Sequence, residues 1–268
     1  MDVEELVARA LAEDVGAGDL TTRATVPASA QARGIFLAKQ DLVVSGLDVA
    51  AVVFRTVDPR VVVDAQVSEG ERAPVRSILG ILAGPARALL TGERVALNFL
   101  QRLSGVATVT REFVDAVEGT KARIRDTRKT TPLLRSLQKR AVAAGGGVPH
   151  RSGLDTGILI KDNHVRLAGG VGEATRRARS AAAGVPVEVE VERIDQIEDA
   201  LLAGAEMLLL DNFAPDAVRE AVGRIAGRVP VEVSGGVTLQ TVRAYAVAGA
   251  DYIAVGALTH SAPSCDIS

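Results

Sequence analysis

The alternation of apolar and polar positions divides the chain into two parts near residue 104. In the first part, residues 3–14 and 86–102 repeat apolar side chains at helical spacing. Short β-branched runs separated by Gly, Pro and Asp predict strands at 33–37, 42–44 and 60–67. The pattern therefore predicts an α+β domain over residues 1–103.

From residue 104 onward, short aliphatic runs alternate with amphipathic segments. The runs are nearly continuous, which suits parallel strands buried on both faces, and they lie at 122–125, 158–160, 187–191, 207–210, 231–233 and 252–255. Helices are predicted between them, at 173–183, 194–203, 216–226 and 239–248. A series that closes on itself predicts a parallel α/β barrel over residues 104–260, with its site at the carboxyl ends of the strands.

Chain length and two glycines refine this picture. About 165 residues follow the first domain, fewer than the roughly 250 of a complete eight-fold barrel, so the barrel is predicted to be shortened. Gly204 and Gly249 stand where a helix end favours a left-handed residue. The last residues, 261–268, are predicted to form a tail that returns to the first domain.

Composition excludes several classes of function. Aromatic residues make up 3% of the chain and Trp is absent, which argues against a base-stacking nucleic-acid binder. The single cysteine, Cys265, cannot form an intrachain disulfide, and no Cys/His set has metal-ligand spacing. The amino terminus is acidic, and no apolar run approaches the ~18 residues of a membrane span. We therefore expect a cytoplasmic protein that binds neither nucleic acid nor membrane.

Positive charge is concentrated between residues 121 and 166. This segment has eleven basic and three acidic residues, in a chain whose net charge is −2. Its charge of +8 indicates an anionic ligand. Three basic residues recur at helical spacing and fit a solvated helix face: Arg135, Lys139 and Arg140. Four others follow a strand or lie in a glycine-rich loop, where barrel sites are built: Arg128, Lys129, Arg151 and Lys161.

Three acidic residues lie on later strands of the predicted barrel or at their ends. Glu188 and Glu190 have the same parity and point to one side of the sheet, and Asp211 ends the next strand. A carboxylate directed into a barrel is costly unless it is paired. Glu190 is therefore either in an ion pair with a lysine, such as Lys129 or Lys161, or a ligand for hydroxyls or a metal.

Small residues follow the last two predicted strands. Ser234-Gly235-Gly236 precedes Thr238, a suitable N-cap for the next helix, and Gly256-Ala257 follows the final strand. Glycines allow backbone N–H groups to approach an anion, and loops at this point of a barrel often bind phosphate. The sequence thus predicts a phosphate site here.

Several longer strings resemble those of the quinolinate phosphoribosyltransferases, a type II phosphoribosyltransferase family also called carboxylating nicotinate-nucleotide pyrophosphorylases. The similarity runs in order from Glu13-Asp14 to the C-terminus. The strings that carry it are Asp126-Thr127-Arg128-Lys129-Thr130-Thr131-Pro132, Gly145-Gly146-Gly147, His150-Arg151, Leu159-Ile160-Lys161-Asp162-Asn163-His164, Leu210-Asp211-Asn212-Phe213, Ser234-Gly235-Gly236 and Val255-Gly256-Ala257-Leu258-Thr259-His260.

The resemblance implies a fold, an assembly and a reaction. The fold is an N-terminal α+β sandwich domain followed by an open, shortened parallel α/β barrel of about six strands. At least a homodimer is implied, in which the partner's sandwich domain covers each barrel mouth. The reaction joins quinolinate to phosphoribosyl pyrophosphate with Mg²⁺, and it gives nicotinate mononucleotide, pyrophosphate and CO₂ in de novo NAD synthesis.

The resemblance also implies roles for individual residues. The quinolinate carboxylates would be held by Arg128, Arg151 and Lys161, with His150 nearby and Arg102 supplied by the other subunit. Lys129 would stabilise the departing pyrophosphate, while Glu190 and Asp211 would bind ribose hydroxyls or Mg²⁺. The remaining substrate-binding positions would be Thr127, Ser234, Gly235, Gly236, Val255, Gly256 and Ala257, of which Ser234 and the small residues cradle the 5′-phosphate. Lys129, Lys161, Glu190 and Asp211 would be the catalytic residues.

The sequence leaves three alternative functions open. Four positions depart from the family's usual pattern and leave open a paralogue that acts on another anionic base: Leu133, Gln138, Arg140 and Pro149. A non-catalytic sugar-phosphate binder would keep the phosphate loops, although retention of Lys129, Glu190 and Asp211 together argues against it. A Schiff-base aldolase is a further barrel alternative, because Lys161 ends a strand.

Overall fold

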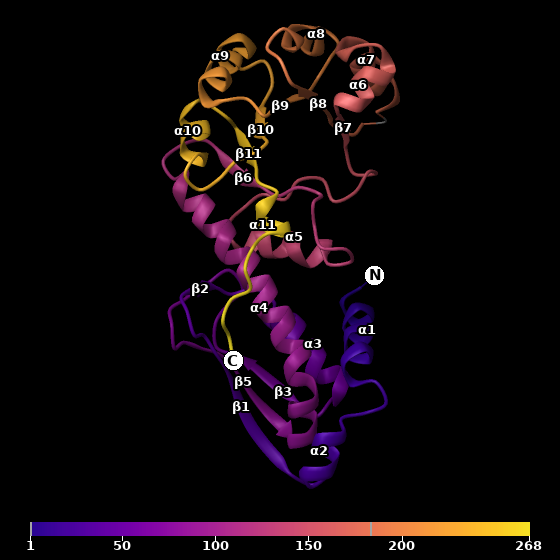
Figure 1. The fold of residues 1–268 in the computed structure, drawn as a ribbon, viewed down its shortest axis with the longest axis vertical. Helices are drawn as coiled ribbons and strands as arrows, with labels where there is room; N and C mark the ends of the chain where they lie inside the picture. Colours follow the sequence, from indigo (N-terminus) through magenta and orange to yellow (C-terminus); the bar gives the residue numbers. More distant parts are fainter. Residues whose placement is uncertain (1, 183) are drawn as a thin grey trace. The chain divides into compact units, whose positions relative to one another are not determined.

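The computed structural model describes residues 2–182 and 184–268, so the predicted ranges that begin at Met1 or end at Ala183 extend outside the described residues. Two compact units are present (Figure 1). The first contains residues 2–111, 131–146 and 261–268, and the second contains residues 112–130 and 147–260 apart from 183. Each unit therefore includes segments that are distant in sequence.

The first unit combines helices with a small antiparallel sheet. Its elements are α1 (Val3–Val15), α2 (Leu20–Thr25), β1 (Gln31–Leu37), β2 (Leu42–Val43), α3 (Leu47–Val57), β3 (Val62–Ala65), β4 (Arg72–Ala73), β5 (Ile78–Pro85), most of α4 (Ala86–Ala116) and α5 (Arg135–Ala144). The sheet has the order β1-β5-β3, and β2 pairs with β4 separately. Phe54, Leu79 and Leu100 are fully buried between the layers. The C-terminal residue also belongs here, because Ser268 exchanges two backbone hydrogen bonds with Leu37 at the end of β1.

The long helix α4 passes through the domain boundary that the sequence predicts at 103/104. It continues to Ala116, whereas the apolar pattern predicts an end at residue 102. Gly105 does not break the helix, and its lack of a side chain serves packing. A Cβ at this position would lie 1.9 Å from the carbonyl oxygen of Pro263 in the C-terminal segment. The first compact unit extends to Arg111, whereas the sequence predicts a boundary after residue 103. The predicted domain boundaries therefore stay a prediction.

The second unit is a parallel barrel sheet with helices on its outer side (Figure 1). Its strands are β6 (Arg123–Arg125), β7 (Ile158–Ile160), β8 (Val187–Val191), β9 (Met207–Asp211), β10 (Val231–Ser234) and β11 (Tyr252–Ala254). They pair in the order β6-β11-β10-β9-β8-β7, and all of these pairs are parallel. The helices are α6 (Asp162–Ala168), α7 (Val171–Ala181), α8 (Gln196–Leu202), α9 (Pro215–Ile225), α10 (Val242–Val247) and α11 (Ala257–His260). The predicted fold class is confirmed.

The predicted barrel strands begin and end within one residue of the observed ones, because each is a short, mostly aliphatic run bounded by charged residues, proline or glycine. Gly204 and Gly249 adopt φ values of 94° and 106° after α8 and α10, as the helix-end pattern predicts. Helix α10 is shorter than predicted. Residues 238–241 form a turn in which Thr241 Oγ1 accepts from the Thr238 N–H at 3.0 Å.

The segment around α5 corrects one interpretation and explains some departures from the family pattern. Lys139 is only 7% exposed, so the solvated-face interpretation is wrong for this residue. Arg140 forms an ion pair with Asp48, and buried Gln138 accepts a hydrogen bond from the Thr131 N–H at 2.9 Å. Leu133, which stands where glycine is common, has a φ of 66°, a left-handed conformation that costs an L-residue about 1 kcal/mol.

No helix in the described part of the chain combines the length and apolar character needed to span a membrane.

Candidate active site

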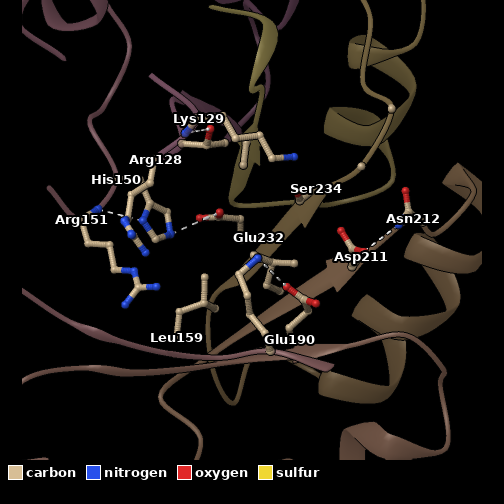
Figure 2. A pocket seen from close by; sticks show the side chains of 16 residues that line it. Arg128, Lys129, His150, Arg151, Leu159, Glu190, Asp211, Asn212, Glu232 and Ser234 are labelled. Atoms are coloured by element: carbon tan, nitrogen blue, oxygen red, sulfur yellow. Dashed lines mark hydrogen bonds and ion pairs between the residues drawn. The ribbon is translucent and has the colours of Figure 1, made fainter. Parts of the chain in front are cut away.

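A cavity of about 520 Å³ lies at the carboxyl ends of the strands in the second unit (Figure 2). The structure brings eleven of the predicted site residues together in its lining: Thr127, Arg128, Lys129, His150, Arg151, Lys161, Glu190, Asp211, Ser234, Gly235 and Gly236. Ala254 also lines the cavity, and it is followed directly by Val255, Gly256 and Ala257. Arg102 belongs to α4 in the first unit, where its Nη1 donates to the carbonyl oxygen of Ala262.

Strand parity explains why the acidic and hydroxyl side chains meet in this cavity. Alternate residues of a strand point to one face, so Glu190 follows Glu188 on the inner face of β8. Parallel register then sets Ser234 of β10 beside Asp211 of β9 at the ends of both strands. The strand ends therefore carry two carboxylates and one hydroxyl side by side.

Arginines form the opposite side of the cavity. Burial and the nearby charge of Arg128 lower the pKa of the Arg151 guanidinium, and Glu188 partly opposes this effect. The Nη1 atom of Arg151 donates to the Gly157 carbonyl at 2.8 Å, while its buried Nε has no hydrogen-bond partner among the described residues. Two guanidinium groups that repel each other in a partly buried site favour binding of a multiply charged anion.

Lys129 is held at its backbone and exposed at its side chain. Its N–H donates to Thr127 Oγ1 at 3.0 Å, and its carbonyl accepts from Thr259 Oγ1 at 2.9 Å. A Cβ on Gly256 would lie 3.3 Å from Lys129 Cδ, so the small residue leaves room for the lysine chain. Figure 2 shows the ammonium group extending across the cavity from the arginine side.

The two carboxylates share one lysine. Lys161 Nζ lies 3.4 Å from Glu190 Oε2, so the ion pair that the sequence offered as one alternative for Glu190 is present. Burial nevertheless raises the pKa of Glu190, with a smaller contribution from Asp211, and burial likewise raises the pKa of Asp211. One ammonium group therefore leaves both carboxylates with the potential to bind further cationic or hydroxyl groups.

The small-residue loop after β10 has a left-handed backbone at two positions. Gly235 and Gly236 have φ values of 97° and 60°, and a Cβ on Gly235 would lie 2.2 Å from Asn212 Oδ1. The predicted helix cap is wrong, however. Helix α10 begins after Thr241 rather than after Thr238, so residues 238–241 separate the small-residue loop from the helix.

Sequence reasoning missed several residues that line the cavity: Leu159, Leu209, Asn212, Glu232 and Ala254. Glu232 had a usable signal, because it is a charged residue in the middle of the apolar run 231–233 and has the same parity as Ser234. Its partners come from other strands, so the sequence did not reveal what it contacts.

Basic and acidic groups thus face each other in one cavity at the carboxyl ends of a six-stranded parallel barrel, which defines the class as an α/β-barrel enzyme for an anionic substrate. Residues 19–104 match the family model of the quinolinate phosphoribosyl transferase N-terminal domain, and residues 106–268 match that of its C-terminal domain. The chain belongs to the quinolinate phosphoribosyl transferase family, and the family predicted from the sequence is confirmed.

Full-length relatives and solved structures agree with this assignment. The chain is 46% identical to nicotinate-nucleotide pyrophosphorylase [carboxylating] of Mycobacterium leprae, over 98% of this chain and 95% of the relative. Identity is 41% to the probable enzyme of that name from Bacillus subtilis, over 100% of this chain and 93% of the relative. The structure of nicotinate-nucleotide pyrophosphorylase from Francisella tularensis has a TM-score of 0.96 and 37% identity, over 99% of this chain and 94% of that chain.

Proposed function

We propose that this protein transfers the phosphoribosyl group of phosphoribosyl pyrophosphate to quinolinate and decarboxylates the product to nicotinate mononucleotide. The chain belongs to this family, and one observation on its structure supports the proposal most strongly. Arg128, Arg151 and Lys161 line the same cavity as Glu190 and Asp211. Two multiply anionic substrates require several cations in one cleft, and the positively charged carbon that forms between them requires nearby carboxylates.

In this proposal the basic residues bind the quinolinate carboxylates and stabilise the departing pyrophosphate. Arg128 and Arg151 hold the adjacent carboxylates of quinolinate, because guanidinium groups form paired hydrogen bonds with a carboxylate. Lys161 adds a point charge beside Glu190. Lys129 lies where it neutralises the charge that develops on the leaving pyrophosphate. The loop of Ser234, Gly235 and Gly236 offers N–H groups to the 5′-phosphate, with the small residues 255–257 beside it.

The acidic residues act on the sugar. Glu190 and Asp211 bind the ribose hydroxyls and stabilise positive charge at the anomeric carbon as the bond to pyrophosphate breaks. The pyridine nitrogen then bonds to that carbon and becomes cationic. The cationic nitrogen stabilises the electron pair that stays on the neighbouring ring carbon when CO₂ departs, and a proton from water then bonds to that carbon, so the step needs no further cofactor.

The donor set also fits Mg²⁺, which prefers carboxylate and phosphate oxygens. The raised pKa values of Glu190 and Asp211 mean that an added cation beside them would be favoured electrostatically. Bound with pyrophosphate, Mg²⁺ would supply neutralisation of the leaving group.

The alternatives differ in how well the site supports them. A Schiff-base aldolase needs a lysine amine that is free to attack a carbonyl, and Lys161 Nζ instead forms an ion pair with Glu190 Oε2. A sugar-phosphate binder does not need Lys129, Glu190 and Asp211 together in one cavity. A paralogue acting on another pyridine or pyrimidine acid uses the same residues, so the substrate has to be tested directly.

The product assay tests the proposed function. Purified protein with Mg²⁺, quinolinate and phosphoribosyl pyrophosphate is expected to form nicotinate mononucleotide and CO₂ in equal amounts. Nicotinate and orotate, offered in parallel, are expected to give no comparable product. Turnover with one of them and none with quinolinate would assign the chain to the paralogue, and binding of phosphoribosyl pyrophosphate without turnover would favour the non-catalytic binder.

Dependence on Mg²⁺ is a separate expectation. Chelation by EDTA is expected to reduce turnover at least about 100-fold, because the pyrophosphate charge then lacks its counterion. Addition of excess Mg²⁺ should restore the rate, and Asp211→Asn should raise the Mg²⁺ concentration needed for half-maximal activity. Equal rates with and without EDTA would contradict the metal proposal and leave the phosphoribosyl transfer proposal intact.

We also propose a homodimer, or a larger assembly built from it, in which a second copy supplies Arg102. The family resemblance supports this proposal. The predicted cytoplasmic location stays a prediction.

A further inference from the structure

Four ionisable side chains meet inside the barrel next to the substrate cavity, and none of the steps above uses them as a group. Arg125 comes from β6, Glu188 from β8 and Glu232 from β10, while His150 lies on the loop that follows β6 and α5. Arg125 Nη1 lies 2.5 Å from Glu232 Oε2, and His150 Nε2 lies 3.0 Å from Glu188 Oε2 and 3.5 Å from Glu232 Oε1. Both carboxyl groups are buried, with Glu232 fully so.

The hydrogen bonds of His150 fix the location of its proton. Its Nδ1 accepts from the Arg151 N–H at 2.8 Å and therefore carries a lone pair. The proton of the neutral ring is then on Nε2, which faces Glu188 and Glu232. Figure 2 shows the ring directed at Glu232. Both ring nitrogens are thus directed at protein groups, so His150 is suited to orient the site rather than to bind the substrate through its ring.

The charges of the cluster do not balance unless it holds an additional proton. Two ionised carboxylates beside one arginine and a neutral histidine would leave a net negative charge in a buried site, which is unfavourable. Burial and the charge of Glu188 raise the pKa of Glu232 to about 7, although His150 and Arg125 oppose the shift. Oε1 of Glu188 has no hydrogen-bond partner in the described part of the chain.

Neighbouring elements supply one further positive charge near this pair, that of Arg151. The guanidinium of Arg125 is stacked 4.1 Å from the Tyr252 ring centre of β11, and it donates to the Met207 sulfur of β9 at 3.6 Å. Lys161 of the β7 end pairs with Glu190 instead. Arg151 is the other cation near Glu188, and its guanidinium lines the substrate cavity.

The same three residues, His150, Glu188 and Glu232, are of metal-ligand types and place their atoms within 4.8 Å of one another. A metal on Nε2 would require the proton on Nδ1, which already accepts from the Arg151 N–H. Arg125 also occupies one oxygen of Glu232. The geometry therefore favours a proton over a metal ion in this cluster.

We propose that Glu188, Glu232 and Arg125 are positioning residues that act through His150. The two carboxyl groups hold one proton between them and keep His150 as the Nε2–H tautomer, and the ring then fixes the Arg151 backbone so that its guanidinium meets the pyridine dicarboxylate. The proposal rests on the proposed function for its substrate. Arg151 is secured at both ends, because its N–H donates to His150 and its Nη1 donates to Gly157.

The first experiment determines the tautomer of the His150 ring and does not depend on an activity assay. The chain has three histidines, so ¹⁵N-histidine labelling gives three ring systems, and His150→Gln identifies the one at issue. At pH 7 the Nε2 of His150 is expected to be protonated and its Nδ1 unprotonated. A His150 protonated at Nδ1, or at both nitrogens, would overturn the proposal. This result stands even if the protein proves inactive on quinolinate, so the two proposals fail separately.

The second experiment separates positioning from folding by kinetics. Glu188→Ala is expected to raise KM for quinolinate about tenfold, a typical effect of losing a group that orients a ligand, with KM for phosphoribosyl pyrophosphate unchanged. Glu188→Gln keeps an acceptor for the Nε2–H and should recover most of the loss. Glu192→Gln, at an exposed position just beyond the same strand, is the matched control. Equal effects on both KM values, or no recovery by Gln, would contradict the positioning role.

The pH profile tests the shared proton. Loss of that proton as pH rises through about 7 adds negative charge beside Arg151 and should raise KM for quinolinate. Glu232→Gln removes the titrating group, so its KM is expected to stay flat over this range. If the variant and the unaltered protein show the same rise, the carboxyl pair is not its source.

Discussion

Replacement of Lys129 by alanine is expected to lower kcat for nicotinate mononucleotide formation by about 10²–10³, the usual cost of removing one preorganised group that stabilises developing charge. The ammonium extends into the cavity from the arginine side (Figure 2). Charge on pyrophosphate increases as its bond to the sugar breaks, so the loss should appear in kcat more than in KM. Initial rates at saturating concentrations of both substrates measure it.

The fold should survive this change. The backbone of Lys129 keeps its bonds to Thr127 and Thr259, and the side chain is exposed. Thermal unfolding should therefore match that of the unaltered protein within a few degrees. Lys121→Ala is the control, because this exposed lysine pairs with Asp251 outside the cavity. A Lys129→Ala enzyme that retains more than about a fifth of kcat would remove Lys129 from its assigned role.

The sequence predicted the barrel and most of the cavity because both follow from local rules. A short aliphatic run followed by charged or small residues marks a strand and its carboxyl end, and parallel strands bring those ends to one edge. Lys161, Asp211 and Ser234 each stand at such an end. Their meeting in one cavity needed no knowledge of long-range contacts beyond the parallel order.

Features that depend on distant partners could not be predicted in this way. Arg125 and Glu232 are 107 residues apart, and nothing in either neighbourhood indicates the pairing. Burial of Lys139 likewise depends on packing around α5, since its helical spacing alone fits a solvated face. Gly105 lies inside α4 and leaves room for the carbonyl oxygen of Pro263, a contact with a residue 158 positions away that the local sequence does not indicate.

Arg102→Ala is expected to lower kcat/KM for quinolinate about 100-fold, because the substrate carboxylates would lose a charged hydrogen-bond donor. The side chain also donates to the Ala262 carbonyl in its own chain, so the fold has to be checked by thermal unfolding. Arg94→Ala, an exposed arginine on the same helix, is the matched control. Normal kcat/KM in Arg102→Ala would contradict its role as a substrate ligand.

Mixing variants tests whether a second copy supplies this arginine. In a heterodimer of Arg102→Ala and Lys129→Ala chains, the barrel with an intact Lys129 would receive Arg102 from its partner, so one of the two sites would be complete. Random association of equal amounts makes half of all dimers heterodimers, and activity should recover to about a quarter of the unaltered level. If each site used Arg102 of its own chain, every site would lack one residue and co-expression would recover nothing. Recovery therefore distinguishes a shared site from a self-contained one, provided that each single variant retains well under a quarter of the unaltered activity.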